Sequence, residues 1–177
     1  MKKVILAIGV PGSGKTTVLK NFAQNYHYAY LSADELRIEM NIAPNNPLIS
    51  SDNPMTQGMW DEMRHRLAQY LKEGKTVVVD ATFTRADLRQ EFVELAKRNG
   101  AQKVQGVFVD TPSELAWERN EQRDRKAPRE VFDKRVHDLR ENPPSLEDGF
   151  DSVFRLDEYQ KLLQTEVAKP VFELKNR

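Results

Sequence analysis

The chain has 177 residues, and its 27 basic side chains balance its 27 acidic ones, so the formal net charge is zero. This length favours one domain with a sizeable core over residues 1–177. The balanced charge excludes a global positive field that would draw the protein onto nucleic acid, so any polyanion site must be a local patch. The absence of cysteine excludes disulfides and thiolate metal sites, and it favours a cytoplasmic location.

No run of the sequence approaches the ~18 apolar residues that a membrane-spanning helix requires, so we expect no association with a membrane. Two lysines precede an apolar run near the start of the chain, as in a signal peptide. Pro11 and Gly12 interrupt that run, and it lacks a small-residue cleavage site. We therefore interpret residues 3–8 as the first strand.

The first strand leads directly into a glycine-rich loop that fits the pattern G-x-x-x-x-G-K-[ST], and a helix-forming stretch over residues 17–23 follows. Strand, glycine loop and helix in this order are typical of a loop that binds the phosphates of a nucleoside triphosphate. The loop consists of Gly9, Val10, Pro11, Gly12, Ser13, Gly14, Lys15 and Thr16, and Thr17 comes next.

The residue types of this loop suit a bound triphosphate. Glycine lets the backbone turn sharply and bring its N–H groups close to the phosphates, at the positive end of the following helix. Lys15 would add a positive charge near the β- and γ-phosphates, and the Thr16 hydroxyl would coordinate Mg²⁺. The sequence therefore predicts ATP, or another nucleoside triphosphate, together with Mg²⁺.

A second strand is predicted over residues 28–31, and the capping box of residues 32–35 predicts a helix that starts at Ala33. Asp34 and Arg37 would share one face of this helix, at the same edge of the sheet as the glycine-rich loop. The carboxylate could take a proton from an attacking hydroxyl, and the arginine could hold an anionic group of the acceptor. The alternative is an ordinary ion pair in the first turn of a helix.

Residues 41–54 contain three prolines among several asparagines and serines, which predicts a loop. A helix is predicted over residues 55–72, before Gly74. A basic patch on it, over residues 64–66, could line an acceptor channel, but we favour an exposed helix face. Apolar side chains recur every four residues along this helix and are expected to face the core. They are Met59, Met63, Leu67 and Leu71.

A third strand, over residues 76–80, ends in Asp80. In many triphosphate-binding enzymes, an acidic residue at the end of such a strand holds Mg²⁺. A fourth strand, over residues 104–109, is followed by Asp110, which has the same form. We favour Asp80 as the metal ligand because its strand is the better neighbour for the first strand. We interpret Asp110 as a structural acid ahead of a helix.

The other elements continue the alternation of helices and strands. Thr84 and Asp87 predict the capped start of a helix that ends near Gly100. Pro112 is expected at the first position of a further helix, and Pro128 would open a helix that extends to about residue 141. This alternation predicts an α/β fold with a parallel sheet of four or five strands. The last two predicted elements are a strand over residues 152–156 and a helix over residues 157–168.

Five basic residues lie within eleven positions between two predicted helices, over residues 119–129. Such a segment suits a flexible lid, because arginines that close over a γ-phosphate stabilise its developing charge and exclude water. The alternative is a solvated helix surface, since acidic residues intersperse the cations. We favour Arg123 as the arginine that acts in catalysis. The basic residues are Arg119, Arg123, Arg125, Lys126 and Arg129.

The glycine-rich loop, the sequence Asp34-x-x-Arg37, Asp80 and the basic lid together resemble the kinase domain of phage-type polynucleotide 5′-hydroxyl kinases. The resemblance covers the order and spacing of these landmarks from residue 1 to about residue 139. It implies a three-layer P-loop kinase fold, with a central parallel sheet, helices on both faces and an Arg-rich lid.

The resemblance also implies roles for single residues. Asp34 would act as general base, Arg37 would contact the phosphate next to the acceptor hydroxyl, and Arg123 would contact the donor phosphates. The predicted catalytic residues are Lys15, Asp34, Arg37 and Arg123, and the predicted metal ligands are Thr16 and Asp80. The predicted nucleotide-binding residues are Gly9, Pro11, Gly12, Ser13, Gly14, Lys15, Thr16, Thr17, Arg119 and Arg123.

The expected function is ATP-dependent transfer of the γ-phosphoryl group to the 5′-hydroxyl end of DNA or RNA, with that nucleic-acid end as the partner. One alternative is a small-molecule kinase for a sugar, a nucleoside or a metabolite, because such enzymes share the loop and the lid. Another is a nucleotide-binding switch or motor ATPase, although a lid within the chain argues against an arginine supplied by a neighbouring subunit. The sequence leaves the oligomeric state open.

Overall fold

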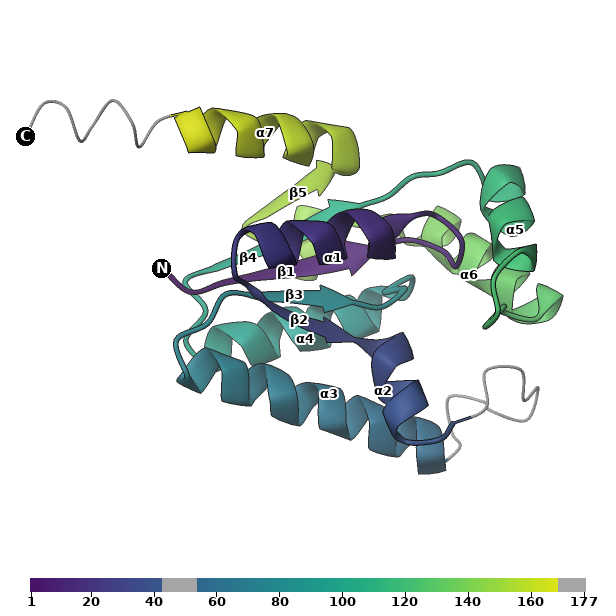
Figure 1. The fold of residues 1–177 in the computed structure, drawn as a ribbon, viewed down its shortest axis with the longest axis horizontal. Coiled ribbons are helices and arrows are strands. Elements are labelled where there is room, and N and C mark those ends of the chain that lie inside the picture. The colour runs from purple at the N-terminus through teal and green to yellow at the C-terminus, as the bar shows by residue number, and fades with distance from the viewer. Residues whose placement is uncertain (43–53, 169–177) are drawn as a thin grey trace, which may run out of the picture.

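The computed structural model describes residues 1–42 and 54–168. A parallel sheet of five strands, in the order β2-β3-β1-β4-β5, forms its centre (Figure 1). The strands are β1 (Lys3–Ile8), β2 (Ala29–Ser32), β3 (Val77–Asp80), β4 (Lys103–Phe108) and β5 (Ser152–Arg155). The helices are α1 (Lys15–Asn25), α2 (Ala33–Glu39), α3 (Pro54–Lys72), α4 (Ala86–Arg98), α5 (Ser113–Glu121), α6 (Arg129–Glu141), the short 3₁₀ helix η1 (Leu146–Asp148) and α7 (Leu156–Ala168).

Helices cover both faces of this sheet, which confirms the predicted three-layer α/β architecture. In Figure 1, α1 and α7 lie on one face, while α3 and α4 lie on the other. The α5 and α6 helices lie beyond the carboxyl ends of the strands. The fifth strand is present, and the first strand has the predicted bounds.

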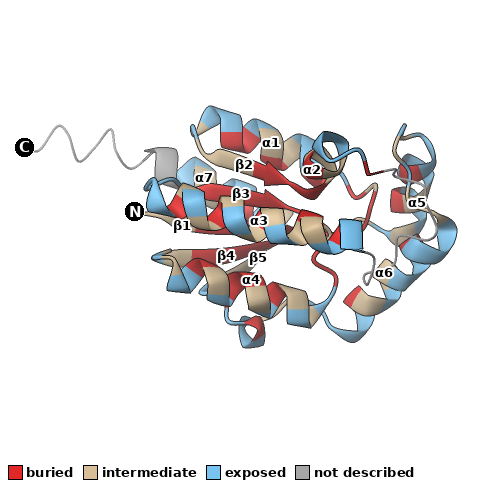
Figure 2. Cartoon of the chain, turned by 90° about the horizontal axis from the view of Figure 1, so that it is seen from below, coloured by how far each residue is buried: buried red, intermediate tan, exposed pale blue. Residues whose placement is uncertain are grey.

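The central strands β1 and β3 are largely apolar because both of their faces are buried. Val4, Leu6 and Ile8 of β1 pack in the larger core cluster, on the side of α3 and α4, while Ile5 and Ala7 pack with α1 and α7. Figure 2 shows this buried centre between layers whose outer surfaces are exposed. The predicted apolar stripe of α3 is confirmed, since Met59, Met63, Leu67 and Leu71 are fully buried.

Helix starts differ in detail from the predictions. The Ser32 hydroxyl accepts a hydrogen bond from the Glu35 N–H at 3.3 Å, but the Glu35 carboxylate pairs with Lys20 of α1 instead of completing the capping box. The prediction that Thr84 caps α4 was wrong, because Arg85 occupies the N-cap position. The buried Thr84 hydroxyl has no hydrogen-bond partner within the described ranges. Pro112 stands at the N-cap of α5, one position earlier than predicted.

Most of the predicted loop over residues 41–54 lies outside the described residues, and its last member, Pro54, is the first residue of α3. Within residues 1–42 and 54–168, no helix combines the length and the apolar character that are needed to cross a bilayer.

A buried ion pair ties α4 to the end of α6 and to η1. The Arg89 side chain is fully buried, and its Nε donates to Asp148 Oδ2 at 2.7 Å. Its Nη1 donates to the Phe83 carbonyl at 3.0 Å, and its Nη2 donates to the Asn142 carbonyl at 2.8 Å. Every guanidinium nitrogen therefore has a partner, which offsets the cost of burying the charge. These bonds also position the loop that follows β3.

We expect the Arg89→Met substitution to destabilise the fold by about 3–5 kcal/mol, because it leaves the buried Asp148 carboxylate uncompensated. Urea unfolding measures this change. The control is Arg98→Met on the same helix, where the Arg98 and Glu94 side chains are 66% and 68% exposed. That exposed pair should contribute no more than about 1 kcal/mol. Equal losses in the two variants would contradict the structural role of Arg89.

Candidate active site

The glycine-rich loop connects β1 to α1 at the carboxyl edge of the sheet, where β3 and β4 flank β1. This is the position at which parallel α/β sheets bind ligands. The Gly9 N–H donates to the Thr82 carbonyl at 3.0 Å, and the Ser13 N–H donates to the Val10 carbonyl at 3.1 Å, which turns the loop back toward α1. Gly14 is the N-cap of α1, with a left-handed φ of 91°.

Gly12 has a second reason to be glycine. Its φ is 80°, and a Cβ atom on it would lie 2.1 Å from the Ala116 carbonyl oxygen and 2.8 Å from the Asn120 nitrogen, both in α5. The loop therefore packs directly against the backbone of α5. The Thr111 hydroxyl adds a hydrogen bond to the Ser13 carbonyl at 2.7 Å. These contacts fix the distance between the loop and the helix that leads into the basic lid.

Lys15 is a buried ammonium, only 8% exposed, and within the described ranges it has no ion-pair partner. Burial lowers the pKa of Lys15, and the Asp80 and Asp34 carboxylates partly oppose this shift. The first turn of α1 has no acidic residue, and the buried Ser13 hydroxyl lacks a partner within the described part of the chain. Unpaired donors at the positive end of a helix fit an anion such as a phosphate group.

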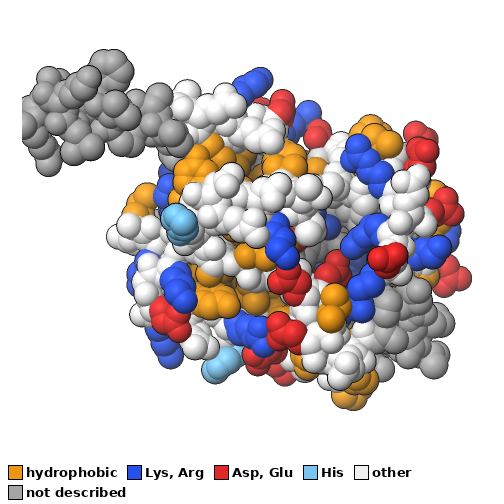
Figure 3. Space-filling view, viewed as in Figure 1, with side chains coloured by type: hydrophobic (Ala, Val, Ile, Leu, Met, Phe, Trp, Pro, Cys, Tyr) orange, Lys and Arg blue, Asp and Glu red, His pale blue; other side chains and the backbone are white. Residues whose placement is uncertain are grey.

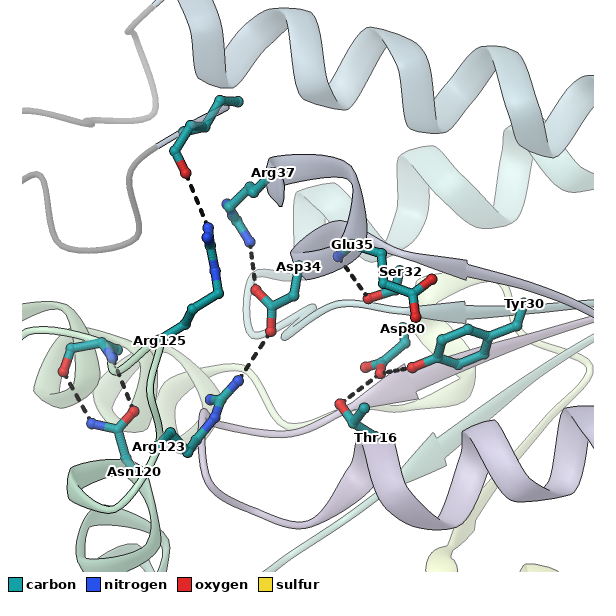
Figure 4. Close-up of polar contacts among 12 residues, drawn as sticks. Thr16, Tyr30, Ser32, Asp34, Glu35, Arg37, Asp80, Asn120, Arg123 and Arg125 are labelled. Atoms are coloured by element: carbon teal, nitrogen blue, oxygen red, sulfur yellow. Dashed lines mark hydrogen bonds and ion pairs between the residues drawn. The ribbon is translucent and has the colours of Figure 1, made fainter. Parts of the chain in front are cut away.

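Asp80, at the end of β3, lies directly beside α1. The β3 strand pairs with β1, as predicted, and Asp80 is opposite both Ala7 of β1 and Ser32 of β2. The Thr16 hydroxyl donates to Asp80 Oδ2 at 2.7 Å, and the Tyr30 hydroxyl donates to the same oxygen (Figure 4). Burial, and then the charge of Asp80, raise the pKa of the Tyr30 phenol, so it remains a donor.

The donor set of Thr16 and Asp80 fits Mg²⁺, which binds proteins through one or two carboxylates and completes its shell with phosphates and water. No group of three or more His, Cys, Asp or Glu side chains within the described residues could hold a metal ion by itself. A cation here would therefore need oxygen atoms from the nucleotide. Asp110 instead forms an ion pair with Arg155 at 3.2 Å, in keeping with a structural acid.

Asp34 lies between two arginines from distant parts of the chain. Arg37 Nη1 donates to Asp34 Oδ1 at 3.1 Å, and Arg123 Nη2 donates to Asp34 Oδ2 at 3.1 Å (Figure 4). Burial acts to raise the pKa of the Asp34 carboxyl, but the charges of Arg37, Arg123 and Lys15 outweigh it and hold this pKa below its usual value. The carboxylate is therefore ionised, and both of its oxygens are engaged by cations.

Hydrogen bonds anchor the two ends of the basic lid. Asn120 is fully buried, and its side chain exchanges two hydrogen bonds with the Ala127 backbone, at 3.0 Å and 2.9 Å. Arg125 reaches across the site and donates to the Ile42 carbonyl at 3.0 Å. Arg119 Nη1 lies 3.5 Å from the position that a Cβ atom on Gly14 would take. The lid thus contacts both the glycine-rich loop and the segment after α2.

The predicted basic residues do not all face the site. Arg129 is the first residue of α6, where it pairs with Asp133 and stacks over the Trp117 ring at 4.6 Å. The basic patch on α3 is engaged by carboxylates along the helix surface: Arg64 pairs with Asp61 and Glu91, and Arg66 pairs with Glu39 and Glu62. Figure 3 shows basic and acidic side chains interspersed on the side of the molecule where α2 and α5 lie.

The predicted residues Pro11, Lys15, Asp34, Arg37, Asp80 and Arg123 come together around one cavity of about 170 Å³. Residues that the sequence patterns did not single out also line it, including Trp60 of α3 and Arg135 of α6. Burial, and then the neighbouring charge of Arg37, lower the pKa of Arg135, against the charge of Asp138. Arg135 lies six positions after Arg129 on a helix rich in charged residues, so the sequence offered no signal that separates it from a surface arginine.

We expect Gly12→Ala to impair the protein much more than Gly74→Ala. Both glycines have a φ near 80°, so each alanine loses about 1–2 kcal/mol of backbone energy. An added Cβ at Gly74 meets no atom within 4 Å, whereas at Gly12 it overlaps the backbone of α5. Denaturant unfolding and binding of a fluorescent ATP analogue measure the difference. Equal stability and equal nucleotide affinity in the two variants would contradict the tight contact between the loop and α5.

Comparison with known proteins identifies the family. The AAA_33 model, described as an AAA domain, matches residues 4–142. The chain is 29% identical over 115 residues to an Acanthamoeba polyphaga mimivirus protein named as a bifunctional polynucleotide phosphatase/kinase; this match covers 65% of the chain and 22% of the relative's length. The relative bears out the resemblance to polynucleotide kinases.

Two solved structures have the same fold. A chain of the Pnkp1/Rnl/Hen1 RNA repair complex superposes with a TM-score of 0.67 at 22% identity, over 85% of this chain and 46% of that one. Shikimate kinase from Bacteroides thetaiotaomicron superposes with a TM-score of 0.55 at 18% identity, over 96% of this chain and 98% of the other. The chain belongs to the AAA_33 family, and its fold is that of a P-loop kinase domain.

Proposed function

We propose that this P-loop kinase domain transfers the γ-phosphoryl group of ATP to the 5′-hydroxyl end of DNA or RNA. The observation that carries the proposal is the position of Asp34, on the wall of the same cavity as Lys15 and between two arginines. A carboxylate at this place can act on a hydroxyl group while the cations hold phosphates on either side. The mimivirus relative is named as a polynucleotide kinase, which supports a nucleic-acid acceptor.

The proposed reaction needs a base and a set of cations. Asp34 would accept the proton of the 5′-hydroxyl group as its oxygen attacks the γ-phosphorus. The bond between that phosphorus and the β-phosphate oxygen breaks, and the products are ADP and a 5′-phosphorylated end. Lys15 and Arg123 would offset the charge of the phosphate oxygens during transfer. Thr16 and Asp80 would hold Mg²⁺, which would supply positive charge to offset that of the phosphates.

Asp34 can act as a base only when its oxygens are released from the arginines. In the free protein Arg123 and Arg37 each bind one oxygen of this carboxylate. Phosphate groups present more acceptor oxygens and more negative charge than a single carboxylate, so donor and acceptor phosphates would compete for the guanidinium groups. We infer that substrate binding moves Arg123 to the donor and Arg37 to the acceptor, which leaves Asp34 free to accept the proton.

The arginines of the cavity support an acceptor that carries a phosphate. Arg37 and Arg135 both line the cavity, and the charge of Arg37 disfavours the charged form of Arg135 more strongly than Asp138 favours it. Arg37 shares the single Asp34 carboxylate with Arg123, so these cations fit a phosphodiester group better than a neutral sugar. Trp60 and Val131 add apolar surface beside them. A chain of zero net charge is also suited to a short terminal segment rather than to a long duplex.

The second candidate function is a small-molecule kinase. The cavity volume of about 170 Å³ favours this alternative, because it would accommodate a small acceptor group without the rest of a polynucleotide. Phosphate transfer from labelled ATP separates the two candidates. A 5′-hydroxyl oligonucleotide, in DNA and RNA forms, is compared with a panel of sugars, nucleosides and shikimate. Transfer to members of the panel only would reject the nucleic-acid acceptor.

We expect Asp34→Asn to reduce turnover on a 5′-hydroxyl oligonucleotide by roughly 10²–10⁴-fold, since it removes the general base and preserves the shape of the side chain. Binding of ATP, measured by calorimetry, should persist. Because the pKa of Asp34 in the free protein lies below its usual value, the wild-type kcat/KM, which reports the free enzyme, should not fall until the pH drops well into the acid range. Turnover within about threefold of wild type would show that Asp34 is not the base.

We expect Arg135→Gln to raise the KM for a 5′-hydroxyl oligonucleotide with little change in the KM for ATP, because the proposed contact is with the acceptor phosphate. The matched control is Arg140→Gln, an exposed position on the same helix. Initial rates at varied oligonucleotide concentrations measure the effect, which should be on the order of 10-fold or more for a charge-assisted contact. A KM effect on ATP alone would assign Arg135 to the donor instead.

A further inference from the structure

Tyr30 lies outside every motif of the sequence, yet its hydroxyl contacts the proposed metal ligand. We propose that Tyr30 is a positioning residue for Mg²⁺ binding, which orients the Asp80 carboxylate through its hydrogen bond to Oδ2. This inference rests on the proposed function, because it assumes that Asp80 helps to hold the metal of a nucleotide complex. It adds Tyr30 to that site and predicts that loss of its hydroxyl group changes the Mg²⁺ dependence of ATP binding.

The register of the sheet explains how Tyr30 reaches Asp80. Tyr30 is opposite Val78, and Ser32, two residues later, is opposite Asp80. Residues two apart in a strand share one face, so Tyr30, Val78 and Asp80 face the same side of the sheet. This is the side covered by α1, where Val78 packs in the core cluster and Tyr30 packs against it. An aromatic side chain is long enough to reach the diagonal neighbour on the next strand.

The two hydroxyls that bind Asp80 define the orientation of its carboxylate. Thr16 and Tyr30 come from α1 and β2, and both donate to Oδ2 of a residue that is only 4% exposed (Figure 4). Two donors on one oxygen restrict rotation of the carboxylate, and they leave the other oxygen for a metal ion or its water. Groups that orient a metal ligand in this way commonly change metal affinity when they are removed.

The ring of Tyr30 is held independently of its hydroxyl. Lys20 of α1 lies over the ring, with its Nζ 5.5 Å from the ring centroid, and pairs with Glu35 of α2. Phenylalanine would keep this cation–π contact and the apolar packing. The Tyr30→Phe variant therefore removes only the polar contacts of the hydroxyl, with Asp80 and with its neighbours Thr16 and Ser32, and keeps the ring in place.

The test is binding of ATP to Tyr30→Phe, measured by calorimetry over a range of Mg²⁺ concentrations and in EDTA. We expect the Mg²⁺ concentration that gives half of the metal-dependent gain in affinity to rise by roughly 10- to 100-fold. Affinity for ATP in EDTA should stay the same, and saturating Mg²⁺ should restore binding. Tyr70→Phe is the matched control, because the Tyr70 ring stacks over Lys75 at 5.1 Å and does not line the cavity. It should leave the Mg²⁺ dependence unchanged.

A double-mutant cycle with Asp80→Ala tests whether the effect passes through Asp80. In that background, Tyr30→Phe should cause no further change in Mg²⁺ dependence, since alanine leaves no side-chain oxygen at position 80 to accept the hydrogen bond. A further change there would overturn the proposal, as would a wild-type Mg²⁺ dependence in Tyr30→Phe or an equal loss of affinity in EDTA. These failures leave oligonucleotide phosphorylation by the wild type intact. Failure of the proposed function appears instead as wild-type protein that shows no Mg²⁺-dependent ATP binding, or that transfers phosphate only to the small molecules of the panel.

Discussion

The parallel register of β2, β3 and β1 is the constraint on which the site depends. Asp80 is opposite both Ala7 and Ser32, so the three strands end within one residue of one another. Parallel strands present their carboxyl ends at one edge, and whatever follows each strand must gather there. The glycine-rich loop follows β1, the helix with Asp34 follows β2, and Asp80 closes β3. A shift of β3 by a single residue would turn the Asp80 side chain to the other face of the sheet.

The charges at this edge are arranged for a ligand that the protein itself does not supply. Lys15 is buried without a carboxylate partner in the described part of the chain, and Arg37 and Arg135 line the same cavity. Asp34 provides partial compensation by binding two of the arginines. A triphosphate and an acceptor phosphate would supply the missing negative charge. Although the net charge of the whole chain is zero, this site therefore carries a local excess of positive charge.

Backbone contacts couple the two halves of this site. The close approach of Gly12 to α5 determines how far the glycine-rich loop lies from the start of the lid. The hydrogen bonds between Asn120 and Ala127 fix the position of the end of the lid. Arg119 and Arg123 project from this short, anchored segment. Their positions are thus determined by packed backbone rather than by the long side chains alone. Arg119 Nη1 thereby lies 3.5 Å from the position of a Cβ atom on Gly14, and Arg123 contacts Asp34.

The sequence by itself determined the elements and the local chemistry. Apolar runs predicted the strands, the period of α3 predicted its buried face, and the spacing of Asp34 and Arg37 predicted their contact, because each signal acts within a few residues. Only the tertiary structure decided the contacts of Arg123 with Asp34, which are 89 residues apart, and of Tyr30 with Asp80, which are 50 apart. Arg135 and Asn120 likewise look like ordinary helix residues until the chain is folded. Their roles depend on which strands and helices become neighbours, and no local pattern encodes that choice.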